Sequence, residues 1–222
     1  MHVVVNAATS ADGKLSTRER RQVELSGEAD FARVDELRAD SDAVMVGVGT
    51  VVADDPSLTV DSERLRERRR GKGKPGNPAR VVADSRIRTP PDAAVLDDDA
   101  ESFLLVSEAA PTDFVGQMEE EGATVITAGE NRVDLSAALE LLESHGIEQL
   151  MVEGGGEIIY SLFENGLLDR LSVFVSPVVI GGRDAPTLAD GDGFVSVFPE
   201  LELEEVRRVD DGVLLVYNIV DP

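Results

Sequence analysis

The chain alternates between short apolar runs, each long enough for one buried strand, and stretches with the apolar periodicity of amphipathic helices. This alternation indicates a mostly parallel sheet with helices on both faces. The predicted strands before residue 155 are Val3–Ala8, Ala43–Val48, Arg80–Ala83, Ser102–Val106, Thr124–Thr127 and Gln149–Val152. The first predicted helix begins at an N-cap on Ser26, carries Phe31, Val34 and Leu37 on one stripe, and ends near Asp40. Two further helices, closed by Gly122 and Gly146, are predicted over Thr112–Glu121 and Leu135–His145.

The C-terminal part of the chain has a different pattern. Leu171–Val175 is apolar, Pro177–Ile180 continues it, and two glycines then interrupt it. Leu201–Val209 and Val213–Val220 are joined by Asp210-Asp211-Gly212, a sequence typical of a tight hairpin turn. We therefore predict one α/β domain over residues 1–222, with a mostly parallel central sheet flanked by helices and an antiparallel C-terminal hairpin.

Composition disfavours several classes of protein. No run approaches the roughly 20 apolar residues needed to cross a bilayer, and no basic stretch leads a longer apolar block at the start. The chain has no cysteine, which excludes disulfides and thiol chemistry. His2 and His145 lie far apart in sequence, so no metal site is expected. We predict a cytoplasmic protein.

Charge is the most pronounced compositional feature, because 21 basic residues stand against 44 acidic ones and give a net charge of −23. Such an excess opposes non-specific binding to nucleic acid. It predicts adaptation to a salty cytoplasm, where screening shortens charge repulsion, and a halophilic source. An acidic patch for one particular partner is the alternative.

A basic segment departs from this acidic background. Residues 64–74 hold seven of the 21 basic residues, and Pro75-Gly76-Asn77-Pro78 follows them. We predict an exposed and mobile insertion loop over residues 62–78. Two alternatives are a loop that helps to hold a phosphorylated ligand and an arm that binds nucleic acid.

Three successive glycines, Gly154, Gly155 and Gly156, lie between a predicted strand and a helix that carries Ile158 and Leu162. Glycines let the backbone approach a ligand, and the start of a helix offers unpaired N–H donors to an anion. The segment therefore favours a phosphate or pyrophosphate site, although a strained turn without a ligand remains an alternative. The Rossmann and Walker A patterns are absent.

A second candidate segment runs from Asp42 to Val60 and passes from a strand through glycines into a short turn. Thr50 and Asp54 are four residues apart, so a helical turn places them on one side. A hydroxyl and a carboxylate in this arrangement suit a ribose or an amide. A solvent-facing turn at Asp54-Asp55-Pro56 is the alternative.

Residues 46–60 resemble the V-G-x-G-T-V-x-A-D-D-P-x-L-T-V signature of the reductase domain of riboflavin biosynthesis. Further motifs follow the family's order along the chain. They are Ser10-Ala11-Asp12-Gly13-Lys14, Arg80-Val81-Val82-Ala83-Asp84-Ser85, Glu153-Gly154-Gly155-Gly156, Gly166-Leu167-Leu168-Asp169 and Pro177 through Gly182. The resemblance covers about residues 3–218, and no zinc deaminase motif accompanies it.

The resemblance implies a dihydrofolate-reductase-like fold, a homodimer, and an oxidoreductase that uses NADPH. The implied substrate is 2,5-diamino-6-ribosylamino-4(3H)-pyrimidinone 5′-phosphate, whose ribose is reduced to the ribitylamino product. A dihydrofolate or pterin reductase and a non-catalytic nucleotide-binding protein are the alternatives. Aromatic contacts for a pterin are few, because the chain has seven phenylalanines, two tyrosines and no tryptophan.

The resemblance also assigns residues to each ligand. The residues that it assigns to the cofactor are Thr50, Asp54, Ser85, Gly154, Gly155, Gly156 and Glu157, and Arg86, beside Ser85, is a reasonable partner for the 2′-phosphate of NADPH. The residues that it assigns to the substrate are Asn6, Ser10, Lys14, Arg38, Leu58 and Glu153.

One departure from the family concerns the substrate phosphate. Related bacterial sequences carry an arginine soon after L-T-V, where this chain has Asp61. We expect Arg64 or a neighbour to replace that charge, or Arg38 and Lys14 to hold the phosphate alone.

No catalytic proton donor is assigned from the sequence. Asp12, Lys14 and Glu153 are the candidates, while His145 is expected to cap a helix.

Overall fold

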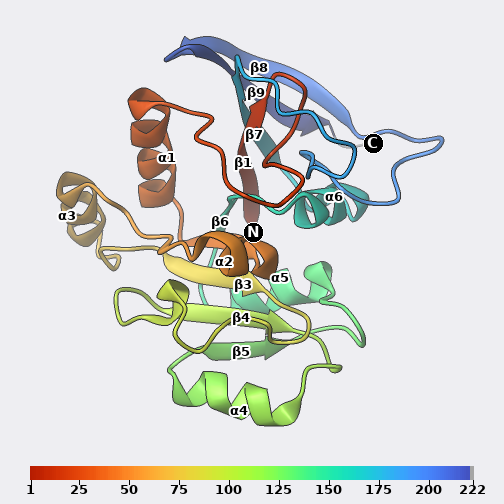
Figure 1. Cartoon of the computed structure of the whole chain (residues 1–222). Coiled ribbons are helices and arrows are strands. Elements are labelled where there is room, and N and C mark those ends of the chain that lie inside the picture. Colours follow the sequence, from red (N-terminus) through yellow and green to blue (C-terminus); the bar gives the residue numbers. More distant parts are fainter. Residues whose placement is uncertain (221–222) are drawn as a thin grey trace. The chain divides into compact units, whose positions relative to one another are not determined.

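The computed structural model describes residues 1–220 and divides the chain into two compact units. Unit 1 comprises Met1 and Asp35–Met151, and unit 2 comprises His2–Val34 and the C-terminal part from Val152. Helix α1 (Glu28–Asp40) and strand β6 (Gln149–Val152) each cross from one unit into the other. Figure 1 labels the elements of both units.

Unit 1 contains strands in the order β5-β4-β3-β2-β6. β2 pairs in parallel with β3, β3 with β4, and β4 with β5, so their carboxyl ends share one edge. β2, β3 and β4 are rich in Val and Leu and are almost fully buried, as expected for parallel strands covered on both faces, whereas β5, the last strand in this order, buries only Ile126. Their bounds are Ala43–Gly47 for β2, Ala79–Ala83 for β3, Ser102–Val106 for β4 and Thr124–Thr127 for β5.

The helices of unit 1 connect these strands. α4 packs against β5 (Figure 1), and Asp134 caps α5 by accepting a hydrogen bond from Ala137 N at 3.1 Å. The bounds are Val48–Asp54 for α2, Glu63–Gly71 for α3, Thr112–Glu120 for α4 and Leu135–Ser144 for α5, with a 3₁₀ turn η1 over Ala94–Leu96.

The prediction of a loop over residues 62–78 is wrong for residues 63–71, which form α3. Asp35 caps the start of this helix, because its carboxylate accepts hydrogen bonds from Asp61 N at 2.7 Å and Ser62 N at 2.9 Å. Leu65 packs with Ala39 and Val60. Capping and tertiary packing thus give helical structure to a segment with very little apolar periodicity.

The basic residues of this segment are paired rather than free. Arg64 and Arg68 donate to Glu36, both at 2.6 Å, and the hydrogen bond from Arg64 is the largest cause of the lowered pKa of Glu36. Arg69 is 2% exposed and donates to carbonyl oxygens, including Ala39 O at 3.0 Å. The remaining partners are Glu63 for Arg66 and Arg70, Asp40 for Lys72, and Asp42 for Lys74. These pairs leave little basic charge for a nucleic acid.

Unit 2 contains strands in the order β1-β7-β9-β8. β1 (His2–Ser10) and β7 (Arg170–Ser176) are parallel, whereas β9 (Gly212–Val220) is antiparallel to both β7 and β8 (Glu200–Val209). Its core includes Phe174, Val209, Leu214 and Val216. Helix α6 (Gly156–Glu164) belongs to the same unit.

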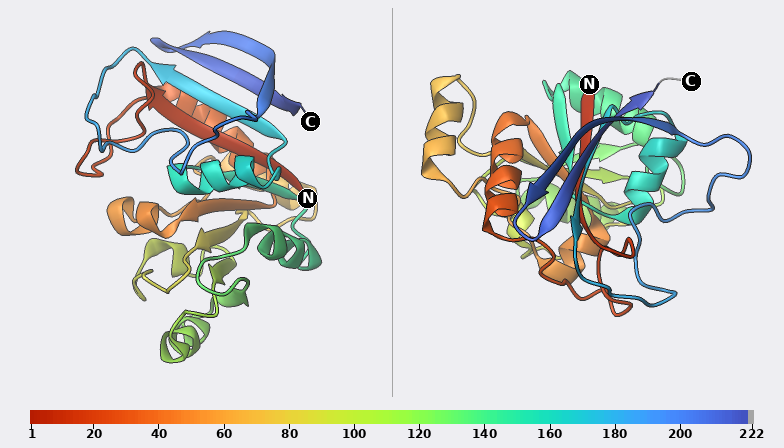
Figure 2. Two further views of the ribbon diagram at one scale, coloured as in Figure 1. Left: turned by 90° about the vertical axis from the view of Figure 1, so that its right-hand side faces the viewer. Right: turned by 90° about the horizontal axis from the view of Figure 1, so that it is seen from above.

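The predicted hairpin of β8 and β9 is confirmed. Gly212 is required here, because a Cβ at this position would lie 2.4 Å from Phe174 Cζ and 2.6 Å from Val175 O. Pro177–Ile180 does not extend β7, which ends at Ser176. Instead, this segment leaves the sheet beside the loop that follows β1, because Val178 O accepts a hydrogen bond from Ala11 N at 2.7 Å and Ile180 N donates to Asp12 at 3.0 Å; Figure 2 shows the two loops.

The predicted apolar stripe of α1 is wrong at Phe31, which is 53% exposed, whereas Val34 and Leu37 are partly buried. The buried residues of the helix include Asp30, Asp35 and Ala39. The two aspartates can be buried because each is hydrogen-bonded, Asp30 to Arg33 and Asp35 to backbone amides. Ser26 is not the N-cap either, since the Asp210 carboxylate accepts the first helical amides of α1.

The fold class is confirmed as α/β with mostly parallel strands and an antiparallel C-terminal hairpin. The division into a single domain stays a prediction. Within residues 1–220, no helix is both long enough and apolar enough to cross a bilayer.

Candidate active site

Four candidate residues of unit 1, Thr50, Asp54, Ser85 and Arg86, follow the carboxyl ends of β2 and β3, at the edge that these strands share with β4. The register pairs Gly47 with Ala83 and Ala83 with Leu105, so the segments that follow these residues leave the sheet at one level. Ligands of open parallel sheets bind at such an edge. It carries α2, the turn that begins at Asp84, and Ser107.

Thr50 and Asp54 lie one helical turn apart on α2, as predicted. Thr50 is partly exposed, Asp54 is exposed, and neither side chain has a hydrogen-bond partner within residues 1–220. The protein around Asp54 nonetheless desolvates its carboxyl group and raises its pKa. Both side chains are available to hydroxyl or amide groups of a ligand.

Ser85 is held firmly after β3. Its hydroxyl oxygen accepts a hydrogen bond from Val133 N at 3.0 Å, and its carbonyl accepts one from Ser107 Oγ at 2.8 Å. The Ser85 hydroxyl therefore still has its own hydrogen to donate. Arg86 is exposed and has no ion-pair partner within the described chain.

Asp84, which sequence reasoning did not select, organises the turn that carries Ser85 and Arg86. It is fully buried, and its Oδ2 accepts hydrogen bonds from Arg88 N at 2.6 Å, Thr89 N at 2.8 Å and Thr89 Oγ1 at 2.8 Å. These bonds reverse the chain immediately after β3. The D-S pair of the motif thus combines a structural carboxylate with an accessible hydroxyl.

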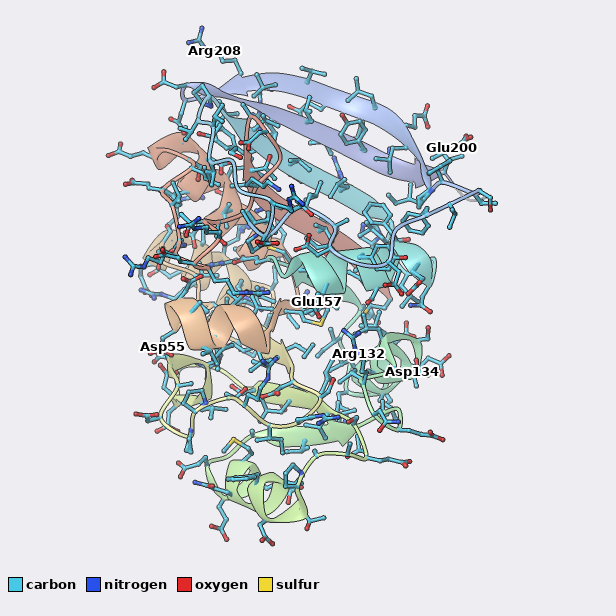
Figure 3. The ribbon with its side chains drawn as sticks, turned by 45° about the vertical axis from the view of Figure 1, so that its right-hand side comes forward. Asp55, Arg132, Asp134, Glu157, Glu200 and Arg208 are labelled. Atoms are coloured by element: carbon cyan, nitrogen blue, oxygen red, sulfur yellow. The ribbon has the colours of Figure 1, made fainter. Side chains whose placement is uncertain are left out.

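A second feature missed from the sequence is the loop after β5. The turn requires glycine at position 129, because a Cβ there would lie 2.3 Å from Arg132 O and 2.8 Å from Asp134 N. The loop supplies Val133 N to Ser85 and ends at the cap of α5 (Figure 3). The glycine followed by a helix N-cap was the available sequence signal.

Arg38 and Leu58 also belong to unit 1. Arg38 donates to Thr59 O at 2.9 Å, which places its guanidinium beside the L-T-V segment. Leu58 has a φ of 55° and is 2% exposed. A contact from Leu58 to a ligand would therefore come from its backbone, held in an uncommon conformation for a side chain of this size.

The glycine loop of unit 2 uses its three glycines differently. Gly154 and Gly155 have φ values of 108° and 91°, in the region that favours glycine, and a Cβ on Gly154 would meet no atom within 4 Å. Gly156 begins α6 beneath residues 187–190, where a Cβ would lie 2.4 Å from Thr187 O. Gly154 therefore leaves space beside the backbone, while Gly156 serves packing. Glu157 is exposed in the first turn of α6.

The S-x-D-G-K turn after β1 is held by hydrogen bonds within itself and to the segment that follows β7. The Ser10 hydroxyl donates to Asp12 Oδ1 at 2.7 Å and accepts from Lys14 N at 2.9 Å. Lys14 Nζ donates to Ala185 O at 3.3 Å, so its ammonium lies beside the loop that covers Gly156. Ser10 is fully buried, and both of these hydrogen bonds of its hydroxyl are made within the turn.

Asp12 is a poor proton donor. Its carboxylate accepts hydrogen bonds from Ser10 Oγ, Ile180 N and Gly181 N, which lower its pKa to about 2. It therefore stays ionised at neutral pH. Glu153 is partly buried directly after β6 and remains a candidate, as does Lys14.

Asn6 lies within β1 opposite Ser172 of β7 and is 7% exposed. Its Oδ1 accepts a hydrogen bond from Arg33 Nη2 at 2.8 Å. Among residues 1–220, no group of three or more His, Asp or Glu side chains is arranged to hold a metal ion.

Comparison with solved structures identifies the class of fold. A pyrimidine reductase-like protein from Corynebacterium diphtheriae superposes with a TM-score of 0.86, at 19% identity, over 100% of this chain and 92% of that one. Dihydrofolate reductase from Enterococcus faecalis, solved with NADP(H), gives a TM-score of 0.52 at 14% identity, over 99% of this chain and 97% of that one. The chain therefore has a dihydrofolate-reductase-like fold.

Sequence comparison identifies the family. The model of the RibD C-terminal domain matches residues 1–215, and the chain belongs to that family. A relative from Archaeoglobus fulgidus is 47% identical over 95% of this chain and 94% of its own length, and one from Methanothermobacter thermautotrophicus is 46% identical over 97% and 95%. Both relatives are named 2,5-diamino-6-ribosylamino-4(3H)-pyrimidinone 5′-phosphate reductase.

Proposed function

We propose that the chain reduces the ribose of 2,5-diamino-6-ribosylamino-4(3H)-pyrimidinone 5′-phosphate to the ribitylamino product of riboflavin biosynthesis, with NADPH as the hydride donor. The observation that carries the proposal is the 47% identity, over nearly the full length of both chains, to a relative named as this reductase. The same relationship supports the proposal that this chain is an oxidoreductase.

The reaction adds a hydride and a proton across a carbon–nitrogen double bond. The ribose ring opens to an imine at C1′, whose reduction would take a hydride from bound NADPH at C1′ and a proton at the nitrogen. The chain's own tasks are to align the substrate with the cofactor and to exclude water. Lys14 and Glu153 remain the candidates to handle the proton, whereas Asp12 is removed because its pKa is about 2.

The cofactor is proposed to contact two sets of residues. In unit 1, Thr50 and Asp54 have accessible side chains without a partner among residues 1–220, and Arg86, which has no ion-pair partner among those residues, is suited to the 2′-phosphate that distinguishes NADPH from NADH. In unit 2, the space beside Gly154 suits a close approach by a phosphate. The proposed cofactor residues are Thr50, Asp54, Ser85, Arg86, Gly154, Gly155, Gly156 and Glu157.

The substrate phosphate is proposed to bind Arg38 and Lys14. Arg64, the other candidate to replace the missing arginine at position 61, is engaged with Glu36 at 2.6 Å. Asn6, Leu58 and Glu153 are proposed to contact the remainder of the substrate, Leu58 through its backbone. Because the Ser10 hydroxyl is engaged, Ser10 is proposed to act by shaping the turn that presents Lys14.

We also propose a homodimer, with β8 at its interface. β8 is the last strand in the order of unit 2, and its side chains Leu201, Leu203 and Val206 are 39–59% exposed. Its first half is acidic from Glu200 to Glu205, and its second half carries Arg207 and Arg208, with Glu200 and Arg208 at opposite ends (Figure 3). An antiparallel second copy would therefore bring acidic halves against basic ones around an apolar centre.

The test of function is the consumption of NADPH by purified protein, followed through the absorbance of the reduced nicotinamide. We predict turnover only with a pyrimidine ribosylamino phosphate. Turnover with dihydrofolate alone would indicate a pterin reductase instead, and NADPH binding without any turnover a nucleotide-binding protein. From the net charge of −23 we propose a cytoplasmic and halophilic setting. The assay therefore requires high salt, because the protein is expected to be weakly active in dilute buffer.

A further inference from the structure

A largely buried polar network in unit 2 joins α1 to strands β1 and β7. Arg33 of α1 donates from Nη2 to Asn6 Oδ1 at 2.8 Å and from Nη1 to Ser172 Oγ at 3.0 Å. Its guanidinium is also ion-paired with Asp30 at 2.7 Å, and the two side chains are 15% and 2% exposed. One guanidinium therefore links a carboxylate and two neutral polar groups on neighbouring strands.

Arg33 determines how the other two side chains are oriented. A guanidinium has only donors, so the atom of Asn6 that it meets must be the amide oxygen. The Asn6 Nδ2 group consequently faces elsewhere, with both of its hydrogens unused by any partner within residues 1–220. Ser172 likewise accepts from Arg33 and keeps its hydroxyl hydrogen to donate.

The position of Arg33 is itself set by the hairpin of β8 and β9. Asp210, at the turn, accepts hydrogen bonds from Asp30 N at 3.0 Å and Ala29 N at 3.3 Å. Gly27 lets the turn approach, because a Cβ there would lie 2.8 Å from Asp210 Cγ. The first turn of α1, which carries Asp30, is thus fastened to the turn between β8 and β9, and Arg33 follows in the next turn of the helix.

Stability alone is a weak reason for this arrangement. A buried ion pair contributes little net stability relative to apolar packing, because both charges lose their hydration. Its best-supported use is to select one geometry among several. Here the selected geometry leaves donors on Asn6 and Ser172, which are adjacent in the register of β1 and β7.

We propose that Arg33 is a positioning residue that orients Asn6 and Ser172 as a pair of donors for an oxygen acceptor of the substrate. Ser172 thereby becomes a substrate-binding residue beside Asn6. The acceptor is the pyrimidinone carbonyl or a sugar hydroxyl. This inference rests on the proposed function, which places Asn6 in the substrate site.

Two variants test the inference in the full-length protein. Asn6→Asp keeps an acceptor for Arg33 but removes the amide donors, and Arg33→Lys keeps the charge but cannot hold Asn6, Ser172 and Asp30 together. Each is expected to raise the substrate KM about tenfold, the usual cost of one lost hydrogen bond in a site, while the Kd for NADPH stays unchanged. The matched control is Arg170→Gln, at a residue of the strand that carries Ser172. This variant breaks an exposed ion pair between Arg170 and Glu204 and is expected to leave the substrate KM unchanged.

The outcomes separate this inference from the function on which it rests. Wild-type protein that turns over, with unchanged KM in both folded variants, overturns the positioning role alone. Wild-type protein that binds NADPH but reduces no pyrimidine phosphate overturns the proposed function itself. If Asn6→Asp does not fold, Ser172→Ala decides, since it removes one donor at nearly constant volume and an unchanged KM contradicts the donor pair.

Inhibition by ribose 5-phosphate locates the acceptor. Weaker inhibition of Arg33→Lys than of the wild type assigns the acceptor to the sugar. Unchanged inhibition together with a raised substrate KM assigns it to the pyrimidinone carbonyl.

Discussion

The carboxylate of Asp12 accepts a hydrogen bond from Gly181 N at 2.8 Å and so connects two motifs that are 169 residues apart in the chain. Its other oxygen accepts from Ile180 N at 3.0 Å. The S-x-D-G and P-x-x-x-G-G motifs are therefore two sides of one structural contact. This explains why a carboxylate, and not a general polar residue, suits position 12.

Replacement of this carboxylate gives a pH-dependent prediction. The pKa of Asp12 falls from 3.8 to about 2 on folding, so its contribution to stability is complete above about pH 4 and is lost as the pH falls through 2. Asp12→Asn is expected to lower the melting temperature at neutral pH. The gap between wild type and variant closes between about pH 4 and pH 2, and a gap that is constant over this range contradicts the assignment.

Buried Arg69 makes a second prediction, about stability. Its guanidinium donates to carbonyl oxygens of Ala39 at 3.0 Å and Pro75 at 2.9 Å, among others, and Arg69 itself is 2% exposed. Arg69→Met is expected to lower the free energy of unfolding by about 3 kcal/mol, because several carbonyls lose their partner. Chemical denaturation in high salt measures this loss.

The neighbouring Arg70 provides the control for that experiment. Arg70 forms an ion pair with Glu63 at 2.7 Å, and both side chains are 55% exposed. Arg70→Met is expected to cost less than about 1 kcal/mol. Equal losses for the two variants would mean that Arg69 has no special structural role.

Arg86 tests the proposed preference for NADPH. Its exposed guanidinium has no ion-pair partner within residues 1–220 and follows the Ser85 turn. Arg86→Gln is expected to weaken NADPH binding about tenfold and to leave NADH binding unchanged, since only the 2′-phosphate loses its charge partner. Titration calorimetry measures both affinities. Arg88→Gln, two residues further on, is the control, and an equal effect from it would count against a specific contact.

Val206 tests the proposed dimer interface on β8. Its side chain is 59% exposed in the single chain. Val206→Asp is expected to convert a dimer into a monomer, because it buries an unpaired charge at the apolar centre of the interface. Light scattering measures the mass, and Phe114→Asp on α4 is the control at another exposed apolar residue. A wild-type monomer, or a variant that stays dimeric, contradicts an interface at β8.

Most of the fold was predictable, because buried parallel strands and a D-D-G hairpin have strong local signals. Helix α3 was not, because its sequence is nearly all charged, and Asp35 caps it from a distant part of the chain. The stripe on α1 failed for a related reason. Sequence patterns assume that aspartates are exposed, whereas Asp30 and Asp35 are buried with partners that sequence spacing does not reveal.

The candidate site was predictable only where a residue acts through its own position in a motif. Thr50 and Asp54 share one side of α2 because four residues make about one helical turn. The Arg33 network was hidden, since Asn6, Ser172 and Asp30 come from three different elements. Motif spacing also did not reveal that the Ser10 hydroxyl is consumed by Asp12 and Lys14.

The most direct test of the proposed function follows the transferred hydride itself. The protein is incubated in high salt with NADPH that carries deuterium on the reactive carbon of the nicotinamide, together with the pyrimidine ribosylamino phosphate, and the product is analysed by NMR. We predict deuterium at C1′ of a ribitylamino product when the enzyme transfers the labelled hydrogen of the nicotinamide. Both stereoisomers of the labelled cofactor are therefore tested. A reduced product without deuterium from either isomer, or no reduced product at all, would contradict it.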